Sequence, residues 1–207
     1  MADQVIGIVG MGPVGSILGA YLARSGVKVY GVDVSQRRVD QVNRDGLFLR
    51  GAIQLQESPE RCVASLAELA GVENLVAVFL CVKTWAIPAV MKEWIKFEWP
   101  EGMRVVVLMN GIGPEDEVGK YVPRERVWRG IINYAGNMDQ EGWVTVNWFH
   151  PPNLIGPASE RVVWWTGGAE EILTKAGLET VQVSYHEMKK AAFFKTILNS
   201  SLNALCA

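Results

Sequence analysis

A glycine run near the amino terminus most constrains what this chain can fold into. Gly10, Gly12 and Gly15 directly follow the apolar segment Val5–Val9. In a G-x-G-x-x-G fingerprint, the first glycine permits a tight strand-to-helix turn, the second lets the backbone approach a pyrophosphate, and the third lets helix and strand pack closely. The helix that begins here presents free N–H groups and a positive dipole to the phosphates. The run therefore predicts a dinucleotide site, whose loop is completed by Met11, Pro13 and Val14.

An acidic residue closes the next apolar segment, Lys28–Asp33, which we expect to be the second strand. Asp33 can accept hydrogen bonds from both ribose hydroxyls of NAD and repels a 2′-phosphate, so it favours NADH. Arg37 and Arg38 lie just beyond it and could reach a 2′-phosphate, which leaves NADPH open. For these two arginines, exposed charges on a second helix are the simpler interpretation.

Apolar runs alternate with amphipathic stretches through the first half, as in β-α-β units around a buried parallel sheet. The fold class predicted is α/β, with a Rossmann-type, doubly wound, mainly parallel sheet. Further strands are expected at Leu75–Val82 and Arg104–Met109. Helices are expected at Pro13–Ser25, Ser35–Asp45, Ser65–Ala70, Ile87–Lys96 and Pro114–Tyr121, and short strands or a hairpin at Leu47–Cys62.

The pattern changes after Val127. Residues 137–142 predict a turn and Trp143–Phe149 a strand, so we expect a hairpin added to the sheet. Further elements are predicted as a strand at Leu154–Pro157, a helix at Gly168–Lys175 and an edge strand at Glu179–Val183.

The last 21 residues, 187–207, predict one amphipathic helix. At about 100° per residue its apolar side chains form an arc that nothing later in the sequence covers. We therefore expect residues 1–185 to be a dinucleotide-binding domain and residues 186–207 to be the first helix of a truncated helical domain for substrate binding or dimerisation. The cover would come from that domain or from another subunit, in a homo-oligomer. The apolar arc holds Phe194, Leu198, Leu202 and Leu205.

A polar stripe lies beside this arc. Lys195, Asn199 and Asn203 recur every four residues, so they line one side of the helix. Desolvation at the edge of an apolar face can lower a lysine pKa and make the ammonium a proton donor near neutral pH. The alternative is a solvated flank of an amphipathic helix.

Two polar residues follow predicted strands directly. Lys83 comes after Leu75–Val82, and Asn110 after Arg104–Met109. The carboxyl ends of parallel strands form the ligand crevice of an open α/β sheet, so both are candidates for binding cofactor and substrate. A surface lysine and an Asn-Gly turn are the alternatives. Trp85 could form a wall of the nicotinamide pocket.

Composition narrows the function further. With a net charge of −2 and no basic run, the chain does not have the pattern of nucleic-acid binders. No apolar run is long enough to cross a bilayer, and no leader peptide is recognisable, so a cytoplasmic protein without a membrane partner is expected. The three cysteines, Cys62, Cys81 and Cys206, are widely spaced, which fits reduced thiols rather than disulfides or a metal site.

Five motifs in this order resemble the ketopantoate reductase (2-dehydropantoate 2-reductase) family along nearly the whole chain. They are the glycine fingerprint, Cys81-Val82-Lys83-Thr84, Asn110-Gly111-Ile112-Gly113, Ile155-Gly156-Pro157-Ala158, and the stripe Lys195, Asn199, Asn203 with Leu205.

The resemblance implies roles for these residues. It implies that Lys195 is the general acid, that Asn199 and Asn203 bind substrate, and that Lys83 and Asn110 lie near cofactor and substrate. The family prefers NADPH and tends to have a basic residue near the end of the second strand, where this chain has Asp33. Its helical C-terminal domain supplies a further serine and glutamate that this sequence lacks.

The function expected is NAD(P)H-dependent reduction of a small branched 2-keto acid, with 2-dehydropantoate (ketopantoate) to pantoate, in pantothenate biosynthesis, as the specific prediction. Two alternatives stay open. One is another Rossmann dehydrogenase with a helical C-terminal domain, of 3-hydroxyacid or glycerol-3-phosphate type. The other is a non-catalytic dinucleotide-binding module.

Overall fold

The computed structural model describes residues 4–161, 165 and 168–205, with the side chains of 202–205 excepted. Its main sheet has eight strands in the order β12-β11-β8-β7-β6-β1-β2-β5. The strands from β5 to β8 are parallel, β11 runs antiparallel to β8, and β12 is parallel to β11 at the edge. This confirms the Rossmann-type, mainly parallel sheet. The strands are β1 (Val5–Val9), β2 (Lys28–Val32), β5 (Arg61–Val63), β6 (Leu75–Leu80), β7 (Arg104–Val107), β8 (Val127–Ile131), β11 (Asn153–Pro157) and β12 (Thr180–Gln182).

Helices cover both faces of this sheet. Successive side chains of a strand point to opposite faces, so Ile6 and Ile8 join one buried cluster with α1 and α6, while Val5 and Val9 join another with α3 and α4. The sheet is therefore doubly wound, as predicted. The helices are α1 (Pro13–Arg24), α2 (Gln36–Asp45), α3 (Leu66–Ala70), α4 (Ile87–Trp94), α5 (Pro114–Val118) and α6 (Ala169–Lys175), with short 3-10 turns at Thr84–Ala86 and Arg124–Arg126.

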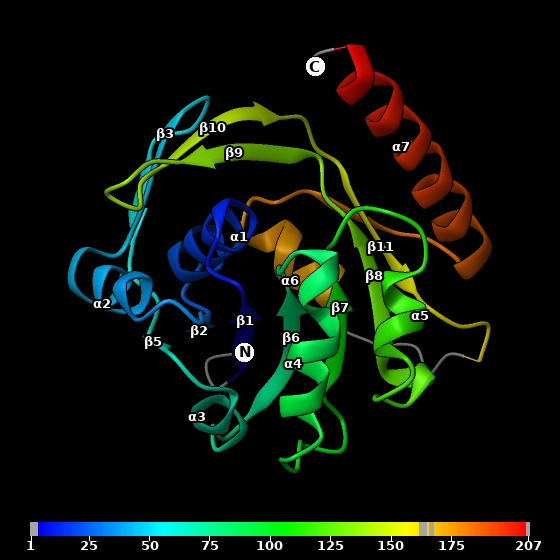
Figure 1. The fold of residues 1–207 in the computed structure, drawn as a ribbon, viewed down its shortest axis with the longest axis horizontal. Coiled ribbons are helices and arrows are strands. Elements are labelled where there is room, and N and C mark those ends of the chain that lie inside the picture. Colours follow the sequence, from blue (N-terminus) through cyan, green and yellow to red (C-terminus); the bar gives the residue numbers. More distant parts are fainter. Residues whose placement is uncertain (1–3, 162–164, 166–167, 206–207) are drawn as a thin grey trace.

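The predicted hairpin is present, but it does not extend the main sheet. β9 (Tyr134–Met138) and β10 (Val144–Phe149) instead form a second sheet with β3 (Leu47–Gly51) and β4 (Leu55–Glu57), in the order β4-β3-β10-β9. The reason is that β10 pairs in parallel with β3 and buries Val144 and Val146 in the α1 cluster. This four-stranded sheet arches over α1, which lies between the two sheets (Figure 1).

The sequence reading missed one strand, β8, at a central position of the main sheet. All five of its residues are buried, including Arg129. A charged residue next to Gly130 hid the strand, since a buried charge is rare unless it is paired. The ion-pair partner of Arg129 is Glu115 on α5, which no local pattern in the strand indicates.

The last helix, α7 (Tyr185–Leu205), begins two residues before the predicted start. Ser184 and Glu187 form a capping box, in which the Glu187 carboxylate accepts a bond from the Ser184 N–H at 2.8 Å. Met188 and Ala192 pack on Ile131 of β8, and the far end of α7 extends away from the sheet (Figure 1). Within the described part of the chain, no helix combines the length and apolarity needed to span a bilayer.

Candidate functional site

The glycine loop has the tight geometry that the fingerprint predicts. Gly10 lies at φ +97°, a conformation that favours glycine, and its N–H donates to the Val32 carbonyl at 2.8 Å. A Cβ on Gly15 would lie 2.0 Å from the Gly10 carbonyl oxygen, so only glycine fits there. A Cβ on Gly12 would meet no atom within 4 Å. Gly12 thus presents open backbone at the start of α1, where a pyrophosphate could approach.

Asp33 joins the end of β2 to this loop. Its carboxylate accepts hydrogen bonds from the Met11 N–H and the Ser35 N–H, both at 2.9 Å. Each carboxylate oxygen has a second lone pair, so the group can still accept from a ribose hydroxyl. The next residue, Val34, is 95% exposed and apolar. The segment therefore places a carboxylate, followed by an exposed apolar side chain, at the end of β2 beside the glycine loop.

The two arginines in the first turn of α2 differ, and the expectation that both are exposed was wrong for one of them. Arg37 is exposed, and its guanidinium donates to the Gln140 carbonyl at 2.7 Å. Arg38 is buried, because its guanidinium donates to the Met11 carbonyl at 2.8 Å, to Ser16 Oγ at 2.7 Å and to the Gly142 carbonyl at 2.8 Å. Arg38 thereby connects the glycine loop to the β9–β10 turn.

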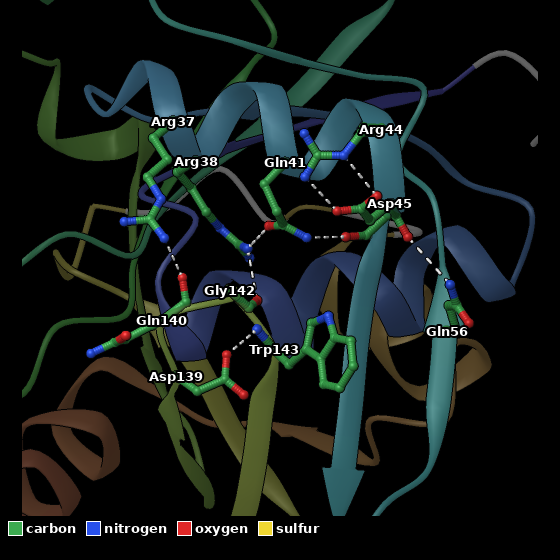
Figure 2. Close-up of polar contacts among 11 residues, drawn as sticks. Arg37, Arg38, Gln41, Arg44, Asp45, Gln56, Asp139, Gln140, Gly142 and Trp143 are labelled. Carbon is green, nitrogen blue, oxygen red and sulfur yellow. Dashed lines mark hydrogen bonds and ion pairs between the residues drawn. The ribbon is translucent and has the colours of Figure 1, made fainter.

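This contact region includes an open groove between α2 and the β9–β10 turn. Figure 2 shows Arg37 and Arg38 reaching from α2 to that turn, with Trp143 beside them. The groove has a volume of about 1000 Å³. It lies along α2 and does not include the glycine loop, so it is separate from the predicted pyrophosphate position.

The carboxyl ends of the central strands bring the other candidates to one edge of the sheet. The Cys81 N–H donates to the Val9 carbonyl at 2.8 Å, which places the segment before Lys83 beside the glycine loop. The Thr84 hydroxyl donates to the Asn110 carbonyl at 3.3 Å. The side chains of Lys83 and Asn110 are exposed, and Trp85 is 82% exposed. The two loops that follow β6 and β7 therefore meet here.

Lys195 reaches back from α7 to this edge. Its ammonium donates to the Ile132 carbonyl, and its side chain is half-buried. Desolvation, followed by the positive charge of Arg129, lowers the pKa of Lys195 to about 8. A lysine with this pKa holds a transferable proton near neutral pH, as the sequence suggested.

A small pocket joins Lys195 to Asn110. Its walls include Asn110, Gly111, Arg129, Lys195 and Thr196. Sequence reasoning missed Arg129, which forms a buried ion pair with Glu115 at 3.0 Å. The sequence signal for Arg129 was a charged residue inside an apolar run. That signal has a meaning only once the run is known to be the buried strand β8.

The polar stripe is described only in part. Asn199 is half-buried on α7, one turn beyond Lys195. The backbone of Asn203 belongs to α7, but its side chain lies outside what the structure describes, as does Cys206.

Thiol and metal chemistry have little support at this edge. Burial raises the pKa of the Cys62 thiol to about 11, and burial also raises that of Cys81. Both described thiols are therefore protonated near neutral pH and are poor nucleophiles. Within the described ranges, no group of three or more His, Cys, Asp or Glu residues is arranged to hold a metal ion.

Comparison with known proteins points to one family. The profile described as ketopantoate reductase PanE/ApbA matches residues 6–160. A 2-dehydropantoate 2-reductase of Lactococcus lactis is 25% identical over 97% of this chain and 63% of its own length. One from Streptococcus pyogenes is 20% identical over 99% of this chain and 64% of its own length. The chain therefore spans less than two thirds of these curated relatives.

Solved structures share the fold. A D-mandelate dehydrogenase with NADH and anilino(oxo)acetate has a TM-score of 0.80 and 22% identity, covering 98% of this chain and 63% of its own. A 2-dehydropantoate 2-reductase from Geobacter metallireducens has a TM-score of 0.74 and 22% identity, covering 87% and 58%.

Proposed function

Because the chain belongs to the ketopantoate reductase PanE/ApbA family, we propose that it carries the cofactor half and part of the substrate half of an NAD(P)H-dependent 2-keto acid reductase. The observation that carries the proposal is Lys195, a half-buried lysine with a pKa lowered to about 8, in one pocket with Asn110 at the carboxyl edge of the sheet. Ligands bind at this edge in open α/β sheets.

The residues present fit a nicotinamide dinucleotide. Gly12 leaves open backbone for a pyrophosphate, and Asp33 has acceptor capacity for a ribose. When bound, the reduced cofactor would supply a hydride to the carbonyl carbon of the substrate.

Lys195 would complete the reaction at the other end of the carbonyl bond. Its ammonium stabilises the negative charge that develops on the substrate oxygen and donates a proton to it. Asn110, Asn199 and Asn203 would orient the substrate, and Lys83 would lie near both cofactor and substrate. The substrate proposed first is 2-dehydropantoate, after the names of the curated relatives.

An aryl 2-keto acid is the second candidate. The support is the likeness to a D-mandelate dehydrogenase that was solved with NADH. The two candidates differ in the group beside the keto acid, which is branched and aliphatic in one and aromatic in the other.

The cofactor proposed is NADH. Asp33 brings a negative charge to the ribose position, and a 2′-phosphate would be repelled by it. The guanidinium of Arg37 donates to Gln140, and that of Arg38 is buried. Arg38 could reach a 2′-phosphate only by giving up buried hydrogen bonds, and Arg37 is directed toward the β9–β10 turn by its bond to Gln140.

The activity test measures oxidation of NADH and of NADPH with 2-dehydropantoate and with phenylglyoxylate, in the longest natural form of this chain. We expect turnover with NADH and a fall of about 100-fold or more in kcat for Lys195→Met. The control is Lys190→Met on the same helix, which should retain kcat. Full activity in Lys195→Met would contradict the role of Lys195, and no turnover of either keto acid would refute the substrate class.

The cofactor test needs no turnover. Binding of NADH and NADPH to this chain is titrated by fluorescence, and NADH should bind more tightly. Asp33→Asn keeps an acceptor but removes the charge, so the preference for NADH should shrink by about tenfold. Tighter binding of NADPH to the unmodified chain would refute the NADH proposal.

The exposed side of α7 would be covered in the working protein. Phe193, Phe194, Ile197 and Leu198 are each between 46% and 61% exposed on it. A further helical segment or a second copy of the chain would bury them. Light scattering distinguishes the two, because only the second gives a dimer that Phe194→Glu dissociates.

A further inference from the structure

We infer that Arg129, held by Glu115, is a positioning residue that keeps the Asn110–Gly111 turn against the Lys195 pocket and favours release of the Lys195 proton. The inference rests on the proposed function, since it concerns the proton of the same lysine. Arg129 does not touch the reacting atoms. It acts through Lys195 and through the turn.

The first step in the argument is the burial of the ion pair. The side chains of Arg129 and Glu115 are only 3% and 9% exposed, and Arg129 Nη1 lies 3.0 Å from Glu115 Oε2. A buried pair is costly to form and is weak support for stability, so it is often retained for another reason. Here Glu115 comes from α5, which begins where the loop that carries Asn110 ends, and Arg129 comes from β8, which pairs with β7 before that loop.

The second step is the contact with that loop. Arg129 Nη2 donates to the Gly111 carbonyl at 3.1 Å. Gly111 has φ +104°, and the loop around it is exposed on its outer side. The guanidinium therefore holds the Gly111 carbonyl, next to Asn110, through Nη2, while its Nη1 pairs with Glu115.

The third step is electrostatic. Arg129 Nε is buried and has no hydrogen-bond partner, so the cation is only partly satisfied by Glu115 and Gly111. Arg129 and Lys195 line the same pocket, so the positive charge of Arg129 acts on Lys195. Desolvation is the larger cause of the lowered pKa of Lys195, and the charge of Arg129 is the second. Of the elements packed on α7, β8 contributes only Arg129 as a charged group, and residues 153–157 of β11 contribute none. Glu115, on α5 behind Arg129, is the opposing charge.

The experiment measures the titration of Lys195 directly in this chain. Competitive labelling with acetic anhydride across a range of pH, read by peptide mass spectrometry, gives the midpoint at which the amine becomes reactive. The double variant Arg129→Met/Glu115→Gln removes both charges with little change in volume and leaves no unpaired buried ion. We expect its midpoint to rise by about half a pH unit or more.

Two single variants separate charge from position. Glu115→Gln leaves Arg129 unbalanced, so the Lys195 midpoint should fall. Arg129→Lys keeps the charge but cannot hold Glu115 and Gly111 together, so the midpoint should stay while kcat/KM of the reductase falls. Arg124→Met is the matched control. Arg124 forms an exposed pair with Asp116, which lies on the same helix as Glu115, so this variant should change neither the Lys195 midpoint nor kcat/KM.

An unchanged midpoint in both the double variant and Glu115→Gln would overturn the inference, whatever reaction the protein catalyses. A shifted midpoint together with full activity in Lys195→Met would instead refute the proposed function of Lys195 and leave the action of Arg129 on its titration standing.

Discussion

The two halves of the candidate site are built differently. Around the glycine loop, the Asp33 carboxylate accepts from the Met11 N–H and the Arg38 guanidinium donates to the Met11 carbonyl, and Met11 and Ser16 are fully buried. Around α7, the Lys195 ammonium donates to the carbonyl of Ile132, just after β8, while Phe194 and Leu198 are more than half exposed. We therefore expect the proposed cofactor half to hold its shape before any ligand binds. For the proposed substrate half, the exposed side chains of α7 predict that its shape depends on what packs on this helix.

Glycine substitutions give the sharpest test of the rigid half. Gly15→Ala places a Cβ 2.0 Å from the Gly10 carbonyl oxygen, which is backbone and cannot yield, so it should lower the free energy of unfolding by about 3 kcal/mol or more. Gly12→Ala meets no atom within 4 Å, so it should leave the Tm nearly unchanged but weaken NADH binding about tenfold. Thermal melts and cofactor titration measure the two effects. Equal Tm values for both variants would refute a tightly packed loop.

The Arg38 contacts test whether the two sheets are coupled through the loop. Arg38→Met removes the bonds to the Met11 carbonyl, Ser16 and the Gly142 carbonyl and should cost about 2–3 kcal/mol of unfolding free energy. NADH binding should weaken as well, because the Met11 carbonyl is part of the loop. Arg37→Met is the control, with one exposed bond to lose. Equal stability of Arg38→Met and Arg37→Met in denaturant unfolding would contradict this coupling of the two sheets.

The pH dependence of stability tests the half of the candidate site around Lys195, in contrast to the half around the glycine loop. The pKa of Lys195 is lowered in the folded chain from 10.5 to about 8, so between these values the unfolded chain binds more protons. Stability contributed by this group therefore rises as the pH increases from about 8 to 10.5, and its charged form opposes folding below 8. Relative to wild type, Lys195→Met should be more stable at pH 7, by about 2–4 °C in Tm, with the gap closing by pH 10.5. A gap that is constant with pH would contradict the shift.

The smallest effect is expected on the open face of α7. Leu198 is 61% exposed, so Leu198→Ser should change the unfolding free energy of this chain by no more than about 0.5 kcal/mol. Leu18→Ser, at a fully buried position of α1, is the contrast and should be severely destabilising. A large loss for Leu198→Ser would mean that the face is already covered.

Much of the fold could be predicted because local patterns and tertiary structure agree. The apolar run at Val5–Val9 and the three glycines indicated a strand, a turn and a helix, and all are present. The hairpin was also predicted, but it was assigned to the main sheet, whereas it belongs to the four-stranded sheet. Pairing of β10 with β3 joins segments about a hundred residues apart, and no periodicity within either segment encodes a partner.

The same division applies to the site. The sequence by itself determined the glycine loop, the position of Asp33 and the spacing of Lys195 and Asn199, because turn geometry and helical periodicity are local properties. Only the tertiary structure decided that Arg38 is buried under the glycine loop and that Arg129 pairs with Glu115 beside Lys195. Burial of a charge depends on a partner brought close by the fold, and desolvation, which depends on all surrounding atoms, is what lowers the pKa of Lys195.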